Sequence, residues 1–106
     1  MSNLKNLKKF DTSLNLFEKF PMILCDLLNL EYIDISFCKI TNIPNKIKNL
    51  KKLKVFNIQS NNLKNLPVEI SQLASLKEFD YSSNEISIVP YEILHMNLIL
   101  EIRKHF

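Results

Sequence analysis

The sequence predicts a repeat protein, a solenoid of stacked 23-residue coils, and three regularities support this. The four prolines of the 106-residue chain stand at positions 21, 44, 67 and 90, always 23 residues apart. The frame L-x-x-L-x-L-x-x-N-x-L-x-x-L-P-x-x-I-x-x-L-x-x recurs without insertion or deletion over residues 7–29, 30–52, 53–75 and 76–98. Of its 28 apolar positions, 27 hold an apolar residue, and only Thr12 departs. A fixed period of this length is the sequence signature of repeat architectures.

Each coil is expected to begin with a short strand around frame positions 4 and 6. Alternate residues of a strand share one face, so both positions point the same way. They hold Phe10, Ile33, Phe56 and Phe79 at position 4, then Thr12, Ile35, Ile58 and Tyr81 at position 6. A single coil cannot bury such a face alone, so neighbouring coils must stack these side chains into one core.

A column at frame position 9 marks the turn after each strand. Its members are Asn15, Cys38, Asn61 and Asn84. A buried turn leaves backbone groups without strand partners, and an asparagine amide has two donors and an acceptor with which to bond adjacent coils. We therefore expect a structural ladder here, with Cys38 as a substitute in the second coil.

The prolines are expected to open the opposite side of each coil. Proline fixes φ and lacks an N–H, which suits a segment that joins no β-ladder. The frame also continues beyond the four coils, into partial coils at 1–6 and 99–106. Two interpretations of these open ends remain: the chain is a segment of a longer array, or its ends pack on another chain.

The stretch LKVFNIQSNNLKNLPVEISQL, residues 53–73, resembles the leucine-rich repeat family, and the resemblance covers nearly the whole chain. The 23-residue length with LPxxI is similar to the intracellular class of Ras-suppressor, scribble-type and plant Ras-group proteins. The resemblance implies an α/β fold, a right-handed solenoid shaped as a horseshoe arc. Parallel strands would line its concave face, and short 3₁₀ or irregular turns its convex face. Residues 1–106 would form a single domain.

Composition excludes several kinds of site. Because the chain has no glycine, it has no P-loop, no dinucleotide fingerprint and no GxSxG nucleophile elbow. Its two cysteines lack the spacing of a zinc site, its net charge of +3 is mild for a nucleic-acid binder, and no stretch approaches a membrane span. We expect no cofactor and no metal, and the missing signal peptide predicts a cytoplasmic protein.

The outward strand positions are the candidate protein-binding residues. Those singled out are Lys9, Asp11, Tyr32, Asp34, Phe37, Val55, Asn57, Gln59, Glu78 and Asp80. With Glu101 and Arg103, which extend the columns, the outward positions sum to a charge of −3. An acidic face with aromatic anchors suits a basic partner protein. Alternatively, Asp at position 5 and Ser at position 7 are features of the scaffold.

A lysine-rich run is the second charged feature. It contains Lys46, Lys48, Lys51, Lys52 and Lys54, with Ile47, Leu50 and Leu53 pointing inward. Such a run could contact anionic lipid, but it lacks interleaved aromatic residues, so a solvated face is the favoured interpretation.

The sequence therefore predicts a non-catalytic module that binds a partner protein through its concave face, in intracellular signalling or scaffolding. By resemblance to the Ras-suppressor class, a small GTPase is a plausible partner. No catalytic residues are predicted, since His95 and His105 have no expected acid–base neighbour. The alternative is a regulatory fragment of a larger signalling enzyme, linked to a kinase, a phosphatase or a small GTPase.

Overall fold

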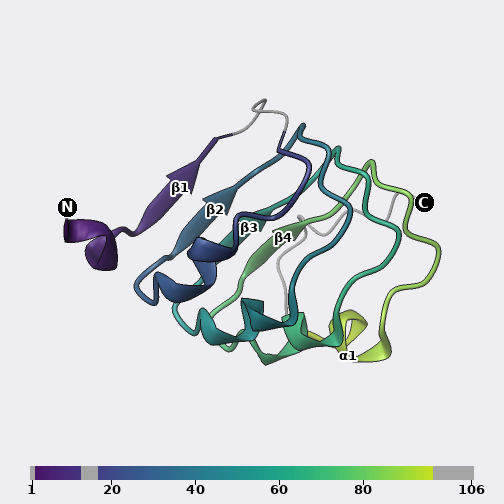
Figure 1. Cartoon of the computed structure of the whole chain (residues 1–106). Coiled ribbons are helices and arrows are strands. Elements are labelled where there is room, and N and C mark those ends of the chain that lie inside the picture. The colour runs from purple at the N-terminus through teal and green to yellow at the C-terminus, as the bar shows by residue number, and fades with distance from the viewer. Residues whose placement is uncertain (1, 13–16, 97–106) are drawn as a thin grey trace.

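The computed structural model describes residues 2–12 and 17–96, and it places a parallel sheet along one side of stacked coils (Figure 1). The strands are β1 (Lys9–Asp11), β2 (Tyr32–Asp34), β3 (Val55–Asn57) and β4 (Glu78–Asp80). They follow one another in chain order, and each is parallel to the next. Parallel neighbours need a crossover connection, and here each crossover is the remainder of one coil.

The strand registers bring the inward residues of successive coils side by side. Ile33 aligns with Phe56, and Phe56 with Phe79, and all three side chains are fully buried. The rings of Phe56 and Phe79 stack with centroids 5.4 Å apart, and Phe20 meets Phe56 edge-on at 6.4 Å. The core therefore runs continuously from coil to coil.

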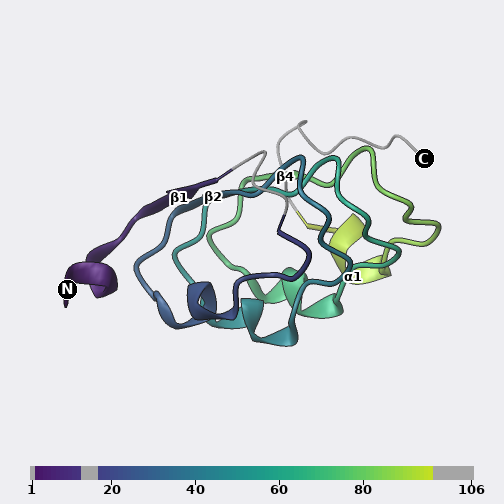
Figure 2. The same cartoon turned by 45° about the horizontal axis from the view of Figure 1, so that its top comes forward.

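Short helical turns form the side opposite the sheet (Figure 2). They are the 3₁₀ helices η2 (Met22–Asp26), η3 (Asn45–Asn49) and η4 (Val68–Gln72), and a single α-helical turn, α1 (Tyr91–Leu94). Each follows a proline directly, and the φ angles of these prolines lie between −73° and −54°, which prepares the helical turn. A further 3₁₀ helix, η1 (Ser2–Asn6), precedes β1.

One residue of every turn anchors the coil from inside. Leu24, Ile47, Ile70 and Ile93 occupy equivalent positions and are fully buried. Each such side chain contributes a gross stabilisation of about 1.5–3 kcal/mol, which conformational entropy largely offsets. Most other residues of these turns are at least partly exposed, although η2 buries Cys25 as well, so the turns are amphipathic.

Asparagine side chains connect adjacent coils where the chain leaves the strand. Asn61 is buried, and its Nδ2 donates to the carbonyls of Ile35 at 2.9 Å and Ile58 at 3.1 Å. Asn84 Nδ2 donates to Ile58 and Tyr81, while its Oδ1 accepts the N–H groups of Asn61 and Leu63. Each amide thus bonds its own turn and the preceding one.

The residue before this column adopts a left-handed backbone conformation in three coils. Phe37, Ser60 and Ser83 have φ of 57°, 56° and 57°. Glycine would be the usual residue here, since a Cβ atom makes this region costly. The turn is made without glycine because backbone bonds hold it: the N–H of Phe37 donates to Gln59 O at 3.0 Å, and that of Ser60 to Ser82 O at 2.9 Å.

The predicted α/β solenoid is confirmed, with parallel strands on its concave face and mainly 3₁₀ turns on its convex face. The ladder residue Asn15 and the partial coil 99–106 lie outside the described residues.

Candidate protein-binding face

The concave face presents two rows of side chains that cross the four strands. Frame position 3 supplies Lys9, Tyr32, Val55 and Glu78, and position 5 supplies Asp11, Asp34, Asn57 and Asp80. Because neighbouring strands lie about 4.8 Å apart, each row is continuous. Eight of the ten predicted binding residues therefore share one surface.

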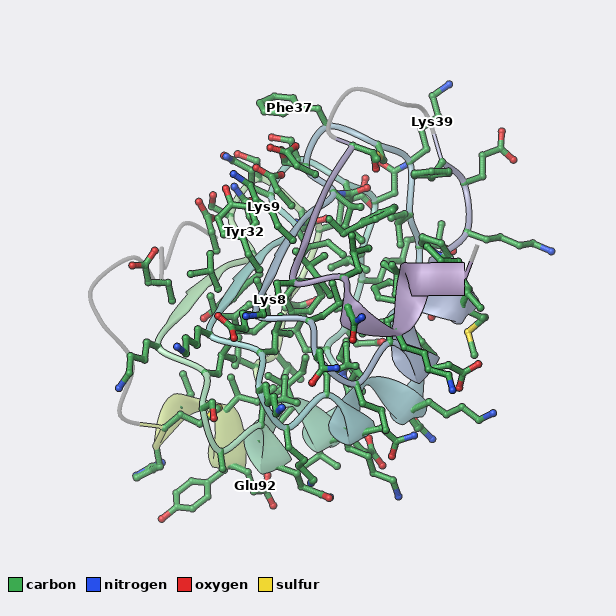
Figure 3. The ribbon with its side chains drawn as sticks, turned by 90° about the vertical axis from the view of Figure 1, so that its left-hand side faces the viewer. Lys8, Lys9, Tyr32, Phe37, Lys39 and Glu92 are labelled. Carbon is green, nitrogen blue, oxygen red and sulfur yellow. The ribbon has the colours of Figure 1, made fainter. Side chains whose placement is uncertain are left out.

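Tyr32 lies near the middle of the first row, with Lys9 over its ring. The Lys9 Nζ is 4.8 Å from the ring centroid, which is a cation–π contact (Figure 3). Burial raises the pKa of the Tyr32 hydroxyl above its ordinary value, and the carboxylate of Asp34 raises it further. The hydroxyl therefore stays protonated at physiological pH and remains available as a hydrogen-bond donor.

A shallow hollow of about 150 Å³ opens beside Tyr32. It is lined by Tyr32, Val55, Phe56, Asn57, Glu78 and Asp80. Its lining combines aromatic and apolar side chains with carboxylate and amide groups. A hollow of this size accommodates a side chain rather than a cofactor, since cofactor pockets enclose about 300–1,000 Å³.

The aspartates of the second row cap their own turns. Asp34 Oδ1 accepts the backbone N–H of Ser36 at 3.0 Å and its hydroxyl at 2.7 Å. Asp80 Oδ1 accepts the same two groups of Ser82 at 3.0 and 2.6 Å. Asn57 does likewise for the N–H of Gln59, at 3.1 Å. Because this geometry recurs from coil to coil, it supports a scaffold role for frame position 5, in addition to any contact with a partner.

Phe37 lies apart from these rows, at the end of the face where the chain has left β2 (Figure 3). Its side chain is 49% exposed, although the backbone is left-handed at φ 57°. A bulky residue in this region costs about 1–2 kcal/mol, and an exposed ring regains little of that through packing. The equivalent residues are the serines Ser60 and Ser83. Gln59, also predicted to bind, is half-buried beside Phe37.

The predicted lysine run divides between two places. Lys46 and Lys48 belong to η3 on the convex side, whereas Lys51, Lys52 and Lys54 lie in the connection from η3 to β3. The backbone of Lys54 is hydrogen-bonded to that of Lys77, and Asn29 links Lys52 to Lys5, so lysines of other coils lie near this connection. The missed signal is that Lys8, Lys54 and Lys77 share frame position 2.

The described residues hold few groups arranged for chemistry. No cluster of three or more His, Cys, Asp or Glu suited to a metal ion occurs within 2–12 and 17–96. His95 is exposed on the convex side, where its Nδ1 lies 3.0 Å from Tyr91 O. The Cys25 thiol is fully buried, and burial raises its pKa to about 11, which suppresses the reactive thiolate.

Helices of the length and hydropathy needed to cross a membrane are missing from the described part of the chain.

Comparison with known proteins identifies the family. A family model described as leucine rich repeat matches residues 28–86, more than half of the chain. The chain belongs to the leucine-rich repeat family. Comparison with curated proteins finds no significant match.

The solved structures that are similar to the chain include the following two. One is a leucine-rich repeat protein of Leptospira interrogans, with 33% identity and a TM-score of 0.75 over 92% of this chain and 24% of that one. The other is the BIR2 ectodomain of Arabidopsis thaliana, with 18% identity and a TM-score of 0.66 over 91% of this chain and 63% of that one. The second likeness shows the fold alone. The chain spans about a quarter of the first structure and under two thirds of the second.

Proposed function

We propose that this chain is a non-catalytic protein-interaction module, which binds a partner protein through its concave face in cytoplasmic signalling or scaffolding complexes. The observation that carries the proposal is the half-buried Tyr32 beside the hollow, with Val55 next to it on the neighbouring strand. Membership of a family whose repeats commonly bind proteins supports it.

The composition of this surface supports protein recognition. Binding hot spots are enriched in tyrosine and lie where surrounding groups exclude water. Tyr32 has an apolar ring, a protonated hydroxyl and Lys9 covering one side of the ring. A partner side chain that enters the hollow would contact the Tyr32 ring and meet the carboxylates of Glu78 and Asp80.

Phe37 is proposed as a second anchor for the same partner. Phe37 places an exposed aromatic ring where the next two coils carry serines in the same left-handed conformation. Aromatic side chains are enriched at the centres of protein interfaces. Resemblance to the Ras-suppressor class makes a small GTPase or its signalling complex a candidate partner, and the carboxylates of the face suit a basic region on it.

The test compares matched aromatic substitutions. The partner is first identified by affinity capture and mass spectrometry, and its affinity for purified variants is then measured. Tyr32→Ala and Phe37→Ser should each weaken binding by about 2 kcal/mol, the usual hot-spot loss. Tyr91→Ala is the control, because Tyr91 is 69% exposed on the convex helix α1.

Circular dichroism and thermal melts establish that the variants stay folded. Unchanged affinity in Tyr32→Ala, together with a loss in Tyr91→Ala, would move the interface to the convex side and refute the proposal.

A further inference from the structure

Six lysines lie at the end of the sheet where the chain enters the strands. They are Lys5, Lys8, Lys51, Lys52, Lys54 and Lys77, and all six are exposed. We name them the lysine edge. We propose that the lysine edge binds the acidic part of a protein partner whose apolar part occupies the hollow beside Tyr32. This inference rests on the proposed function, and it specifies the partner's chemistry.

Backbone bonds hold this edge together across all four coils. Lys8 O accepts the N–H groups of Glu31 and Tyr32 at 2.8 and 3.1 Å. Lys54 repeats the arrangement, since its O accepts from Lys77 and Glu78 at 2.9 and 3.1 Å. The residues at frame position 2, Lys8, Glu31, Lys54 and Lys77, therefore follow one another at the spacing of the strands, and their backbones are held as firmly as the sheet.

Side-chain bonds order part of the edge as well. Asn29 Nδ2 donates to Lys5 O at 2.8 Å, and Asn29 Oδ1 accepts from Lys52 Nζ at 2.8 Å. Lys51 Nζ reaches Gln72 O at 3.5 Å. Neutral oxygens thus position two ammonium groups without cancelling their charge. A partner that meets ammonium groups already held in place loses less side-chain entropy on binding.

Carboxylates compensate little of this charge. Glu31 occupies frame position 2 in the second coil, and its Oε1 lies a long 3.8 Å from Lys54 Nζ, with both side chains partly exposed. Such an exposed pair contributes little to stability. The edge therefore carries six lysines against Glu31, and this excess of positive charge would attract an anionic partner.

The neighbouring surface selects among anionic partners. Lys54 and Lys77 directly precede Val55 and Glu78, which line the hollow, so the lysine edge borders the hollow. Glu78 and Asp80 line that hollow and would repel a second phosphate or carboxylate. Nucleic acid and anionic membranes carry negative charge throughout. A protein segment can place glutamates over the lysines and an apolar side chain over Val55, so it satisfies both surfaces.

The spacing fixes the layout of that segment. Frame positions 2 and 5 are three residues apart, about 10 Å along the strand. In the partner segment, the acidic side chains that meet the lysines and the side chain that meets the second row must be separated by a similar distance. A segment that crosses the face along the strand direction meets lysines first, the hollow next and the second-row aspartates last.

The test uses two triple charge reversals of the intact chain. The edge variant carries Lys51→Glu, Lys54→Glu and Lys77→Glu. The control variant carries Lys39→Glu, Lys48→Glu and Lys64→Glu, which are exposed lysines outside the edge and change the net charge equally. The main probe is a synthetic peptide with a run of glutamates followed by leucines. An all-glutamate peptide, single-stranded DNA and phosphatidylserine vesicles are the comparison probes.

We expect the glutamate–leucine peptide to bind best, and the edge variant to weaken it at least about tenfold while the control variant leaves it within about twofold. Equal losses in both variants would reduce the effect to net charge and overturn the proposal. Tighter binding of DNA, vesicles or the all-glutamate peptide would also overturn it, since the hollow would then contribute nothing.

Failure of this proposal is separable from failure of the proposed function. If Tyr32→Ala abolishes binding of the natural partner while the edge variant retains it, the concave interface stands and the lysine edge is excluded from it.

Discussion

The side-chain oxygen of Asn61 accepts the backbone N–H of Ile40 at 3.0 Å, across the boundary between the third and second coils. The Asn61 amide also donates to Ile35 O in the second coil and to Ile58 O in its own. A single buried side chain therefore satisfies the turns of two coils. The stack is held by polar bonds at this turn, in addition to the apolar core.

Replacing Asn61 with Ala should lower the free energy of unfolding by about 1–3 kcal/mol, because buried backbone groups of two coils lose their partner. Urea denaturation followed by circular dichroism measures the change. Asn62→Ala is the matched control, since Asn62 is exposed and its side chain lies outside the ladder. A midpoint equal to that of the wild type would refute the ladder role of Asn61.

Cys38 occupies the same column with much weaker bonding. Its Sγ has one hydrogen bond, to Ser36 O at 3.6 Å, and a thiol cannot match the acceptor strength of an amide oxygen. Cys38→Asn should restore the bonds that Asn61 makes one coil later, and raise stability by about 0.5–1.5 kcal/mol. A rise in the urea midpoint checks this. If the midpoint falls, the second turn has a shape that an asparagine does not fit.

The capping role of the second row predicts a difference between removing an oxygen and removing a charge. Asp80→Ala deletes the acceptor of both Ser82 bonds and should cost about 1 kcal/mol. Asp80→Asn keeps the oxygen and should cost little, as Asn57 serves this way in the third coil. Urea denaturation of both variants checks the prediction. Equal losses would mean that the charge, rather than the hydrogen bond, supports the turn.

The inward residues of the strands were predictable because alternation and the 23-residue period act together. Ile33, Phe56 and Phe79 obey both rules, and the structure buries all three. Cys25 was not foreseen as a core residue. Its frame position is exposed in the second and fourth coils, at Lys48 and Leu94, yet the thiol is fully buried. Whether a turn residue is buried depends on how the neighbouring coil packs against it, and the residue pattern of a single coil does not show this.

The lysine edge shows a second limit of reading along the chain. The run from Lys46 to Lys54 was visible as a local cluster, but the coil sends its members to two sides. The grouping in space follows frame position 2, where Lys8, Lys54 and Lys77 come from three coils. Charge must be summed down the columns of a repeat protein, because neighbours on its surface are one period apart in sequence.

Cys25 provides a prediction about pH. Burial, with a smaller contribution from the nearby Asp26 carboxylate, raises the pKa of its thiol from 9.0 to about 11 in the folded chain. Between these values the unfolded thiol ionises while the folded one stays protonated, so the folded state binds more protons there. The free energy of unfolding should therefore fall as pH rises from about 9 to about 11.

Urea denaturation of the wild type and of Cys25→Ala across this pH range separates the contribution of the thiol from that of tyrosines that ionise at similar pH. The free energy of unfolding should fall more steeply with pH in the wild type than in Cys25→Ala. The difference between the two slopes should vanish well below pH 9.0, where the thiol is protonated in both states. A thiol reagent gives an independent measurement, since labelling of the folded chain should be limited by opening of the coil. Parallel stability curves in the two proteins would show that Cys25 ionises as readily folded as unfolded, in contradiction to its burial in η2.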